Sequence, residues 1–470
     1  MQEGSQMAAN QTTSDLPKNG DVLIKILAFT LILSSMSATM FNIVLPEIRA
    51  DFGLSVAQVS WVSTVYLLIY AVGSVIYGKL LDRYRAKTLI TFGLLVFAAG
   101  SLLGLLATSF VFVLSARVLQ AIGASVVPAL AMMIPVRYFP PERRGRALGI
   151  SSTGLALGNA IGPIVSSLLV SLVHWRWLFA IPLLILATLP FYRKFLVEER
   201  RMEGRIDWLG GGLLAGTVAL LLLAITQGSL TLGAGSLAAF LVFIWRIRTA
   251  AEPFVSRALL RDRVYLMGLT IAALVMSISY ALPFLTPQLL ADINRLEPGW
   301  IGFVMVPGAC VSAYLGRKVG KMADIKGNSF VYHSAFALLF GCFLALSFFV
   351  GSVAAVIGFI FAFGTVGQMF MQIALSNTIS RSIPKDQVGV GMGLMTLCNF
   401  LSGAVATGIY GKIMDHGATA PWLPWQSHEE AFVFSNLYLV LAIAHVGILI
   451  LYRSVFVRKK NARAAATLQA

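Results

Sequence analysis

Long stretches of mostly apolar residues recur along the whole chain, separated by short polar segments. A helix of about 20 apolar residues crosses the hydrocarbon core of a bilayer. Fourteen such stretches lie near residues 22–46, 57–77, 88–108, 110–136, 147–172, 178–196, 208–228, 231–247, 264–290, 299–319, 329–350, 353–378, 388–411 and 432–452. Only 12% of the 470 residues are charged, against about 25% in soluble domains. The sequence therefore predicts an all-α integral membrane protein with 14 transmembrane helices.

Lys and Arg are distributed unequally between the two sides of this predicted bundle. If each stretch crosses the membrane, both termini lie on one side. That side holds all of the 36 cations except Arg49, Arg117, Arg176, Arg295 and Lys412. Cytoplasmic loops are enriched in Lys and Arg, so the tails, residues 1–21 and 456–470, are predicted to be cytoplasmic. Topology accounts for the net charge of +16, and no nucleic-acid partner is predicted.

A short charged segment occurs twice at equivalent places in the pattern of spans. The first copy, residues 78–87, carries Asp82 among cations, and a looser copy, residues 320–327, carries Asp324. Each is expected to be a loop after the second span of a six-span group, as in transporters built from internal repeats. This predicts an N-terminal six-helix half at 22–200 and a C-terminal half at 264–455. Two inserted helices and their linkers occupy 201–263.

The first charged segment resembles the loop motif Gly-x-Leu-x-Asp-Arg-x-Gly-Arg-Arg/Lys of the major facilitator superfamily. Gly78, Leu80, Asp82, Arg83 and Lys87 match the motif, whereas a cation replaces its second Gly and an alanine replaces its penultimate cation. The resemblance implies alternating access, with the charged segments acting as cytoplasmic latches between the halves. The residues assigned to the latch are Gly78, Asp82, Arg83, Lys87, Gly320 and Asp324.

The fourth span contains an arginine, which is costly in lipid unless it faces water or a partner. Arg117 and Gln120 resemble the superfamily pattern Arg-x-x-Gln-Gly-x-Gly, except that Ala121 replaces the first Gly. The resemblance implies a coupling role, beside a proton site or an anionic group of the substrate. A structural role, with Arg117 bonded to backbone carbonyls, is the alternative, and the sequence leaves both open.

The fifth span carries small residues at four-residue spacing, which let helices approach closely. Gly154, Gly158, Gly162 and Pro163 resemble the antiporter signature of the superfamily and are assigned to a hinge and seal between the halves. The stretch 175–179, Trp-Arg-Trp-Leu-Phe, is similar to one in the 14-span drug:proton antiporters. Residues 127–130, 139–147 and 205–207 look like those of tetracycline exporters of the Gram-positive class K and L type.

Polar residues at helical spacing on several spans predict a cavity lined by amides, hydroxyls and aromatic rings. Hydrogen bonding between helices is the alternative explanation. Such a lining suits an amphipathic organic molecule better than an inorganic ion. The residues assigned to the substrate cavity are Thr39, Asn42, Asn159, Tyr280, Gln368, Gln372 and Asn399.

Acidic residues are absent from the middle of every predicted span, although proton coupling normally uses a buried carboxylate. The related exporters carry such acids on spans 1, 5 and 13, where this chain has Ala38, Asn159 and Gly403. Three explanations stay open: Asp82, Asp207 or Asp324 at the cytoplasmic ends takes the proton, the substrate carries the charge, or coupling is lost. His445 on the last span is a weaker candidate for titration.

These patterns together predict a monomeric secondary transporter in a bacterial plasma membrane. It exports an amphipathic organic compound, such as a drug or a tetracycline-like antibiotic, by alternating access in exchange for protons. The alternative is a lipid or metabolite exporter or flippase with atypical or lost proton coupling. No cofactor, metal site or enzymatic activity is expected, because the five His and three Cys are scattered.

Overall fold

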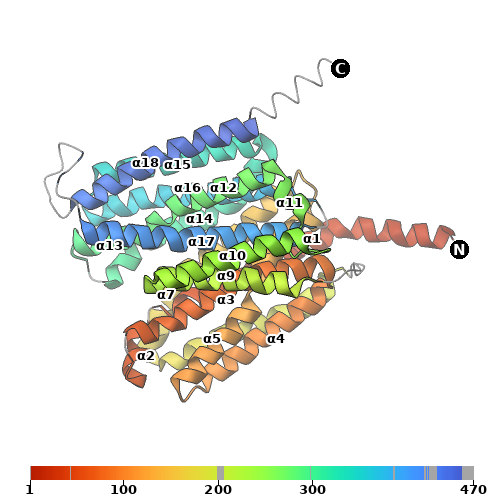
Figure 1. Ribbon diagram of the computed structural model, residues 1–470, viewed down its shortest axis with the longest axis horizontal. Coiled ribbons are helices and arrows are strands. Elements are labelled where there is room, and N and C mark those ends of the chain that lie inside the picture. Colours follow the sequence, from red (N-terminus) through yellow and green to blue (C-terminus); the bar gives the residue numbers. More distant parts are fainter. Residues whose placement is uncertain are drawn as a thin grey trace. The chain divides into compact units, whose positions relative to one another are not determined.

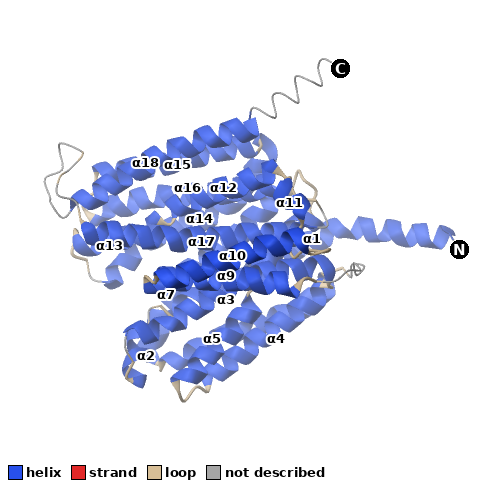
Figure 2. Cartoon of the chain, in the orientation of Figure 1, coloured by secondary structure: helices blue, strands red, loops and turns tan. Residues whose placement is uncertain are grey.

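The computed structural model describes residues 2–42, 44–54, 56–197, 206–296, 298–384, 387–417, 420, 422 and 431–457. These residues form helices joined by short turns, and no strand occurs among them (Figure 2). Thirteen helices there are long and apolar enough to cross a membrane. The span predicted near 299–319 corresponds to a shorter apolar helix, Trp300–Gly316. The all-helical membrane fold is confirmed, and the count of fourteen spans stays a prediction.

The first compact unit comprises residues 1–205 and 384–394. Within it, α1 packs along α7, and α4 packs along α5. Its elements are α1 (Gln2–Met40), α2 (Leu45–Phe52), α3 (Val56–Arg83), α4 (Ala86–Leu105), α5 (Phe110–Ala124), α6 (Val126–Tyr138), α7 (Arg144–Leu172), the 3-10 helices η1 (Trp175–Phe179) and η2 (Ile181–Thr188), α8 (Leu189–Phe195), and the first turns of α17 (Val388–His416).

The second unit comprises residues 206–383 and 395–470. Here α9 and α10 lie side by side as a hairpin (Figure 1), α16 packs on α14 and α15, and α15 also packs on α18. Its elements are α9 (Trp208–Gln227), α10 (Leu230–Thr249), α11 (Arg257–Arg261), α12 (Arg263–Ser279), α13 (Ala281–Asp292), α14 (Pro298–Lys326), α15 (Asn328–Phe348), α16 (Ala354–Ser380), the rest of α17, α18 (Phe432–Tyr452) and the π-helical η5 (Arg453–Val457).

Two spans are interrupted where a proline removes a backbone donor. Pro128 cannot donate to the carbonyl of Ala124, which is where α5 ends. Pro283 likewise leaves the carbonyl of Ser279 free at the end of α12, and the side-chain amide of Gln368 donates to that carbonyl instead. The polar side chain thus satisfies a backbone group that would otherwise be buried without a partner.

The two charged segments are more helical than the sequence predicts. Helix α3 continues to Arg83, so only Tyr84 and Arg85 separate it from α4. Helix α14 includes both Gly320 and Asp324, and only Gly327, whose φ is +86°, separates it from α15. The prediction of loops at 78–87 and 320–327 was therefore wrong for all of these residues except Tyr84, Arg85 and Gly327. Charged residues mark where a chain leaves the membrane, but the helix keeps its backbone hydrogen bonds into water.

Candidate functional site

Asp82 lies in the last turn of α3 and is only 8% exposed. Its Oδ1 accepts a hydrogen bond from the backbone nitrogen of Gly389 at 2.8 Å, and its Oδ2 accepts one from Val390 at 2.9 Å. Both donors belong to the first turn of α17. A carboxylate is favourable there, because the first N–H groups of a helix have no partner within it and carry partial positive charge.

A cation and two glycines complete this arrangement, which we call the α3–α17 contact (Gly78, Asp82, Arg137, Gly389 and Val390). Arg137 of α6 pairs with the Asp82 carboxylate at 3.4 Å and donates to the carbonyl of Leu81 at 3.2 Å. A Cβ on Gly78 would overlap the carbonyl of Gly389, and a Cβ on Gly389 would overlap that of Gly78. The glycines therefore let the two backbones touch, which brings Asp82 within reach of the N–H groups.

The structure brings together only part of the predicted latch. Gly78 and Asp82 meet α17, whereas Arg83 and Lys87 lie half-buried on either side of the turn after α3. Gly320 is buried and Asp324 is half-buried, both in α14 of the second unit. Sequence reasoning missed Arg137 and the α17 glycines. The alternation of glycine at 389, 391 and 393 was the available signal.

Arg117 is completely buried in the first unit. Its guanidinium carbon lies 4.4 Å from the centre of the Phe41 ring and 4.1 Å from that of Tyr66. Its Nε donates to the carbonyl of Val62 at 3.1 Å, and its Nη1 donates to that of Ser37 at 3.2 Å. Aromatic faces and carbonyl oxygens thus offset part of the cost of burying the charge.

Gln120 extends this network towards α4. Its carbonyl oxygen accepts from Nη1 of Arg117 at 3.0 Å, and its amide nitrogen donates to Oγ of Ser101 at 2.8 Å. Nη2 of Arg117 has no hydrogen-bond partner among the described residues. The contacts fit the structural alternative for Arg117, and the free Nη2 is the atom that a coupling role would use.

The glycines of α7 pack against α1 in the same unit. A Cβ on Gly158 would overlap Oγ of Ser35, and one on Gly162 would overlap Oγ1 of Thr39. A Cβ on Gly154 would lie 2.5 Å from the carbonyl oxygen of Ala28. The ladder thus fits α1 against α7, and a role between the halves stays a prediction. The side chain of Pro163 lies outside the described residues.

The predicted cavity residues of the first unit lie on α1, just after it, and on α7. Thr39 is half-buried and donates back to the carbonyls of Ser35 and Met36, at 3.2 and 3.3 Å. Asn42 is exposed and accepts from Oγ of Ser63 at 2.5 Å. Asn159 is exposed on α7. Asn42 and Asn159 are therefore open to a ligand or to lipid.

In the second unit the predicted cavity residues are half-buried on α16 and α17 and between α12 and α13. The ring of Tyr280 occupies the space that a Cβ on Gly403 would need. The side-chain amide of Gln368 donates to the carbonyl of Ser279 at the end of α12, and Gln372 lies one helical turn further along α16. Oδ1 of Asn399 is buried with no hydrogen-bond partner among the described residues. Gln368 thus has a structural contact, and Asn399 keeps a free acceptor.

Asp207 holds the base of the α9–α10 hairpin. Its Oδ1 accepts from the backbone nitrogen of Gly210 at 3.1 Å, and from Nε and Nη2 of Arg246 at 3.1 and 3.0 Å. Burial favours the neutral acid, but the hydrogen bonds from Arg246 and the backbone outweigh it and hold the pKa of Asp207 below its usual value. A group that stays ionised near neutral pH is a poor proton carrier, which argues against Asp207 in that role.

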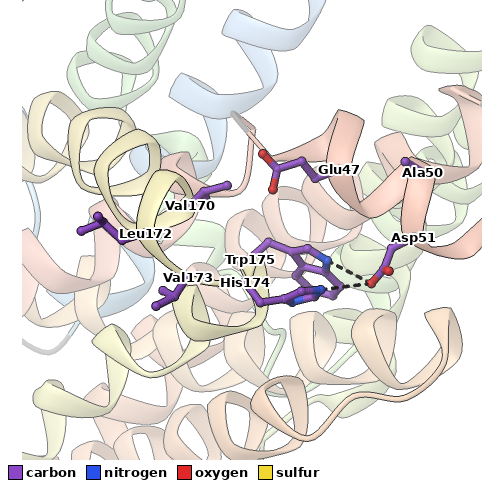
Figure 3. Close-up of a pocket in the computed structure, with 8 residues that line it drawn as sticks. All are labelled: Glu47, Ala50, Asp51, Val170, Leu172, Val173, His174 and Trp175. Atoms are coloured by element: carbon purple, nitrogen blue, oxygen red, sulfur yellow. Dashed lines mark hydrogen bonds and ion pairs between the residues drawn. The ribbon is translucent and has the colours of Figure 1, made fainter.

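A pocket of about 730 Å³ lies beside α2, which precedes the start of α3, whereas Asp82 lies in the last turn of α3. Figure 3 shows the residues that line this pocket. It lies between α2, the end of α7 and the start of η1. The residues lining it are Glu47, Ala50, Asp51, Val170, Leu172, Val173, His174 and Trp175. No group of three or more His, Cys, Asp or Glu suited to a metal ion occurs in the described part of the chain.

Comparison with known proteins identifies the fold and the family. The human organic anion transporter MFSD10 (TETRAN) has a similar structure, with a TM-score of 0.67 at 14% identity, over 91% of this chain and 99% of that one. Riboflavin transporter RibZ of Clostridioides difficile (strain 630) is 24% identical over 94% of this chain and 98% of its own length. Multidrug resistance protein 3 of Bacillus subtilis (strain 168) is 27% identical over 63% of this chain and 60% of its own.

RibZ and MFSD10 are both named transporters. The family model of the Major Facilitator Superfamily matches residues 27–407, which is most of the chain. The chain therefore belongs to the Major Facilitator Superfamily.

Proposed function

We propose that this protein exports an amphipathic organic compound, a drug or an antibiotic such as a tetracycline, by alternating access. The observation that carries the proposal is the α3–α17 contact. Its charged partner Asp82 is buried and bonded to two backbone donors at the start of α17. Helix α17 continues beyond this contact into the second unit. The contact can therefore restrain a helix that both units share.

In this mechanism the α3–α17 contact acts as a latch for one state of the cycle, the outward-open one. A hydrogen bond to a charged group contributes about 1.5–3 kcal/mol. Breaking two such bonds makes the release of α17 from Asp82 unfavourable. Substrate binding, or water that enters from the cytoplasm and bonds to the freed groups, can offset this cost. Arg83, Lys87, Gly320 and Asp324 stand as further candidates for the latch, and Gly154, Gly158, Gly162 and Pro163 for the hinge.

The proposed topology has fourteen spans with both termini in the cytoplasm of a bacterium. The first half is assigned to 22–200, the inserted pair to 201–263 and the second half to 264–455. With both tails inside, the turn after α3 and the α3–α17 contact face the cytoplasm, and the pocket of Figure 3 faces outwards. Glycosylation or cysteine-labelling maps of these two ends would test this orientation.

Exchange for protons is part of the proposal, although no carboxylate lies in the middle of a predicted span. Asp82 is the strongest candidate for the proton, because its neutralisation would weaken its bonds to α17 and so couple protonation to release. Arg117 and Gln120 stand as candidates for coupling, beside a proton site or an anionic group of the substrate. The candidates for the substrate cavity are Thr39, Asn42, Asn159, Tyr280, Gln368, Gln372 and Asn399.

Expression of the gene in a drug-sensitive bacterium tests the proposal. Cells carrying the wild-type gene should tolerate higher concentrations of tetracycline or of cationic dyes, and cells carrying Asp82→Asn at equal protein level should not. Protection by neither gene against any of a panel of amphipathic drugs would refute drug export.

A metabolite exporter is the second candidate function. The observation that favours it is the likeness to a riboflavin transporter over 98% of that protein's length. Riboflavin is amphipathic and suits the same amide and hydroxyl lining. Accumulation of a flavin or another metabolite in the medium of expressing cells, without drug protection, would favour this candidate over the first.

A further inference from the structure

The pocket of Figure 3 contains a histidine whose ring takes part in the start of a helix. His174 precedes η1, and its Nδ1 accepts a hydrogen bond from the backbone nitrogen of Arg176 at 3.3 Å. Nε2 of the same ring lies 3.6 Å from Oδ2 of Asp51 on α2. The ring therefore caps one element and faces a carboxylate on another.

Arg176 and Trp175 join the same group to the rest of this face. Nη2 of Arg176 pairs with Oδ2 of Asp51 at 3.2 Å, and Nε donates to the carbonyl of Ala107, between α4 and α5, at 2.7 Å. Nε1 of Trp175 donates to the same Asp51 oxygen at 3.2 Å. We call Asp51, His174, Trp175 and Arg176 the outer cluster. It ties η1 to α2 and to the α4–α5 turn.

The cap requires an unprotonated Nδ1, because a ring nitrogen that carries a hydrogen cannot accept one. The Nη1 atom of Arg176 also lies 3.3 Å from Nδ1 and 3.1 Å from Nε2 of His174. Protonation would remove the cap and place a second cation beside this guanidinium. Histidine in general changes charge between about pH 5 and 8, which sets the pH range of the test.

Two acids, Asp51 and Glu47, are the charged residues that line the pocket beside His174 in the described part of the chain. Asp51 favours the imidazolium, but its oxygen is already shared with Arg176 and Trp175. Glu47 lines the same pocket one helical turn before Asp51 on α2, and it adds to the attraction for a proton. Among the described side chains at the end of α7, the apolar Val170 and Leu172 line the pocket. The two acids therefore favour protonation of the ring, whereas the cap and the neighbouring guanidinium of Arg176 disfavour it.

We propose that His174 is a proton-binding site that releases η1 from α2 and from the α4–α5 turn when it is protonated. The site lies at the end of the first unit opposite to Asp82, which is the external end in the proposed topology. Acidification of that side would loosen the outer cluster and change the rate of the cycle. Its local effect on η1 does not depend on what the protein transports.

Two substitutions separate the charge of His174 from its capping function. His174→Asn keeps an acceptor of the kind preferred at helix starts but cannot titrate in this range. His174→Lys is permanently cationic and offers no acceptor. Hydrogen exchange of the peptide 174–179, measured by mass spectrometry on the full-length protein in lipid nanodiscs, reports the cap directly.

In the wild type, exchange of this peptide, corrected for the intrinsic effect of pH, should become roughly 2- to 30-fold faster between pH 8 and pH 5, the range expected for loss of a cap. His174→Asn should stay protected at both pH values, and His174→Lys should exchange fast at both. The proposal is overturned if the wild type and His174→Asn show the same corrected pH profile.

Asp51→Asn provides an independent check, because it removes the anion that favours the imidazolium. The acceleration of exchange between pH 8 and pH 5 should then be smaller than in the wild type. An acceleration equal to or larger than that of the wild type would contradict the assigned geometry. Failure of these measurements would leave the proposed export activity untouched, since none of them measures transport.

Discussion

The carboxylate of Asp82 lies 2.8 Å from the backbone nitrogen of Gly389, although 307 positions separate the two residues in the sequence. The glycine is required at its own position, because any Cβ there would overlap the carbonyl of Gly78 and approach Asp82 itself to 2.6 Å. Acid and glycine are therefore parts of one contact, and a change in either should disturb the same step.

Neutralising Asp82 tests that contact. Asp82→Asn keeps one acceptor but presents an amide to the second N–H donor, so the charge and about one hydrogen bond of roughly 1.5–3 kcal/mol are lost. We expect normal expression and abolished transport, measured as dye efflux from loaded cells. Asp262→Asn is a suitable control, because Asp262 caps α12 by similar backbone bonds far along the chain. Normal efflux by Asp82→Asn would remove the latch from the mechanism.

The packing of α7 on α1 should depend on the absence of a side chain at Gly158. Gly158→Ala would force a methyl group against Oγ of Ser35 and should cost about 1–3 kcal/mol, the usual effect of overpacking. Gly212→Ala is the matched control, since a Cβ there meets nothing within 4 Å. Thermal unfolding in detergent should show a lower Tm for the first variant only. Equal Tm values would contradict the described α1–α7 packing.

The hairpin of α9 and α10 should lose stability when Asp207 loses its charge. Because folding lowers the pKa of Asp207, its contribution is complete above the unfolded value of about 3.9 and is lost as pH falls through the lower folded value. Asp207→Asn retains a capping oxygen but weakens the bonds to Arg246, at a cost of about 1–3 kcal/mol. The difference in Tm from wild type should be constant between pH 5 and 8 and shrink below about pH 4. A difference in Tm that grows on acidification would contradict the conclusion that folding lowers the pKa of Asp207.

Arg117→Lys distinguishes the two roles left open for this residue. Lysine keeps the charge but cannot reproduce the planar fork that reaches Val62, Ser37 and Gln120. If the role is structural, the free energy of unfolding should fall by about 1–3 kcal/mol, and Tm and transport should fall together. The exposed Arg248→Lys should be silent in both assays. A variant that melts like wild type but transports nothing would instead assign Arg117 to coupling.

Apolar length and charge asymmetry were sufficient to predict the class of fold, because a bilayer permits few structures besides helices. The motif also pointed to Asp82 and Gly78. Its partners could not be read in advance, since Arg137 and Gly389 carry no local pattern that names α3 as their neighbour. Such pairings are set by how helices pack, and one sequence contains no direct record of packing.

Gln368 illustrates the same limit at the predicted cavity. Its spacing with Gln372 indicates one helix face, but spacing cannot tell a ligand-binding amide from one that satisfies a carbonyl. The amide of Gln368 serves the carbonyl freed by Pro283 at the end of α12. The proline predicts that a carbonyl of α12 needs another donor, but it does not predict which residue supplies that donor.

Uptake into inverted proteoliposomes tests export most directly, with tetracycline or a fluorescent cation outside and an acidic interior. The account predicts concentrative uptake by the wild type that falls to the leak rate when the pH gradient is collapsed, and no uptake by Asp82→Asn reconstituted at equal density. Uptake by neither protein in the presence of the gradient would contradict the account, as would equal uptake by both.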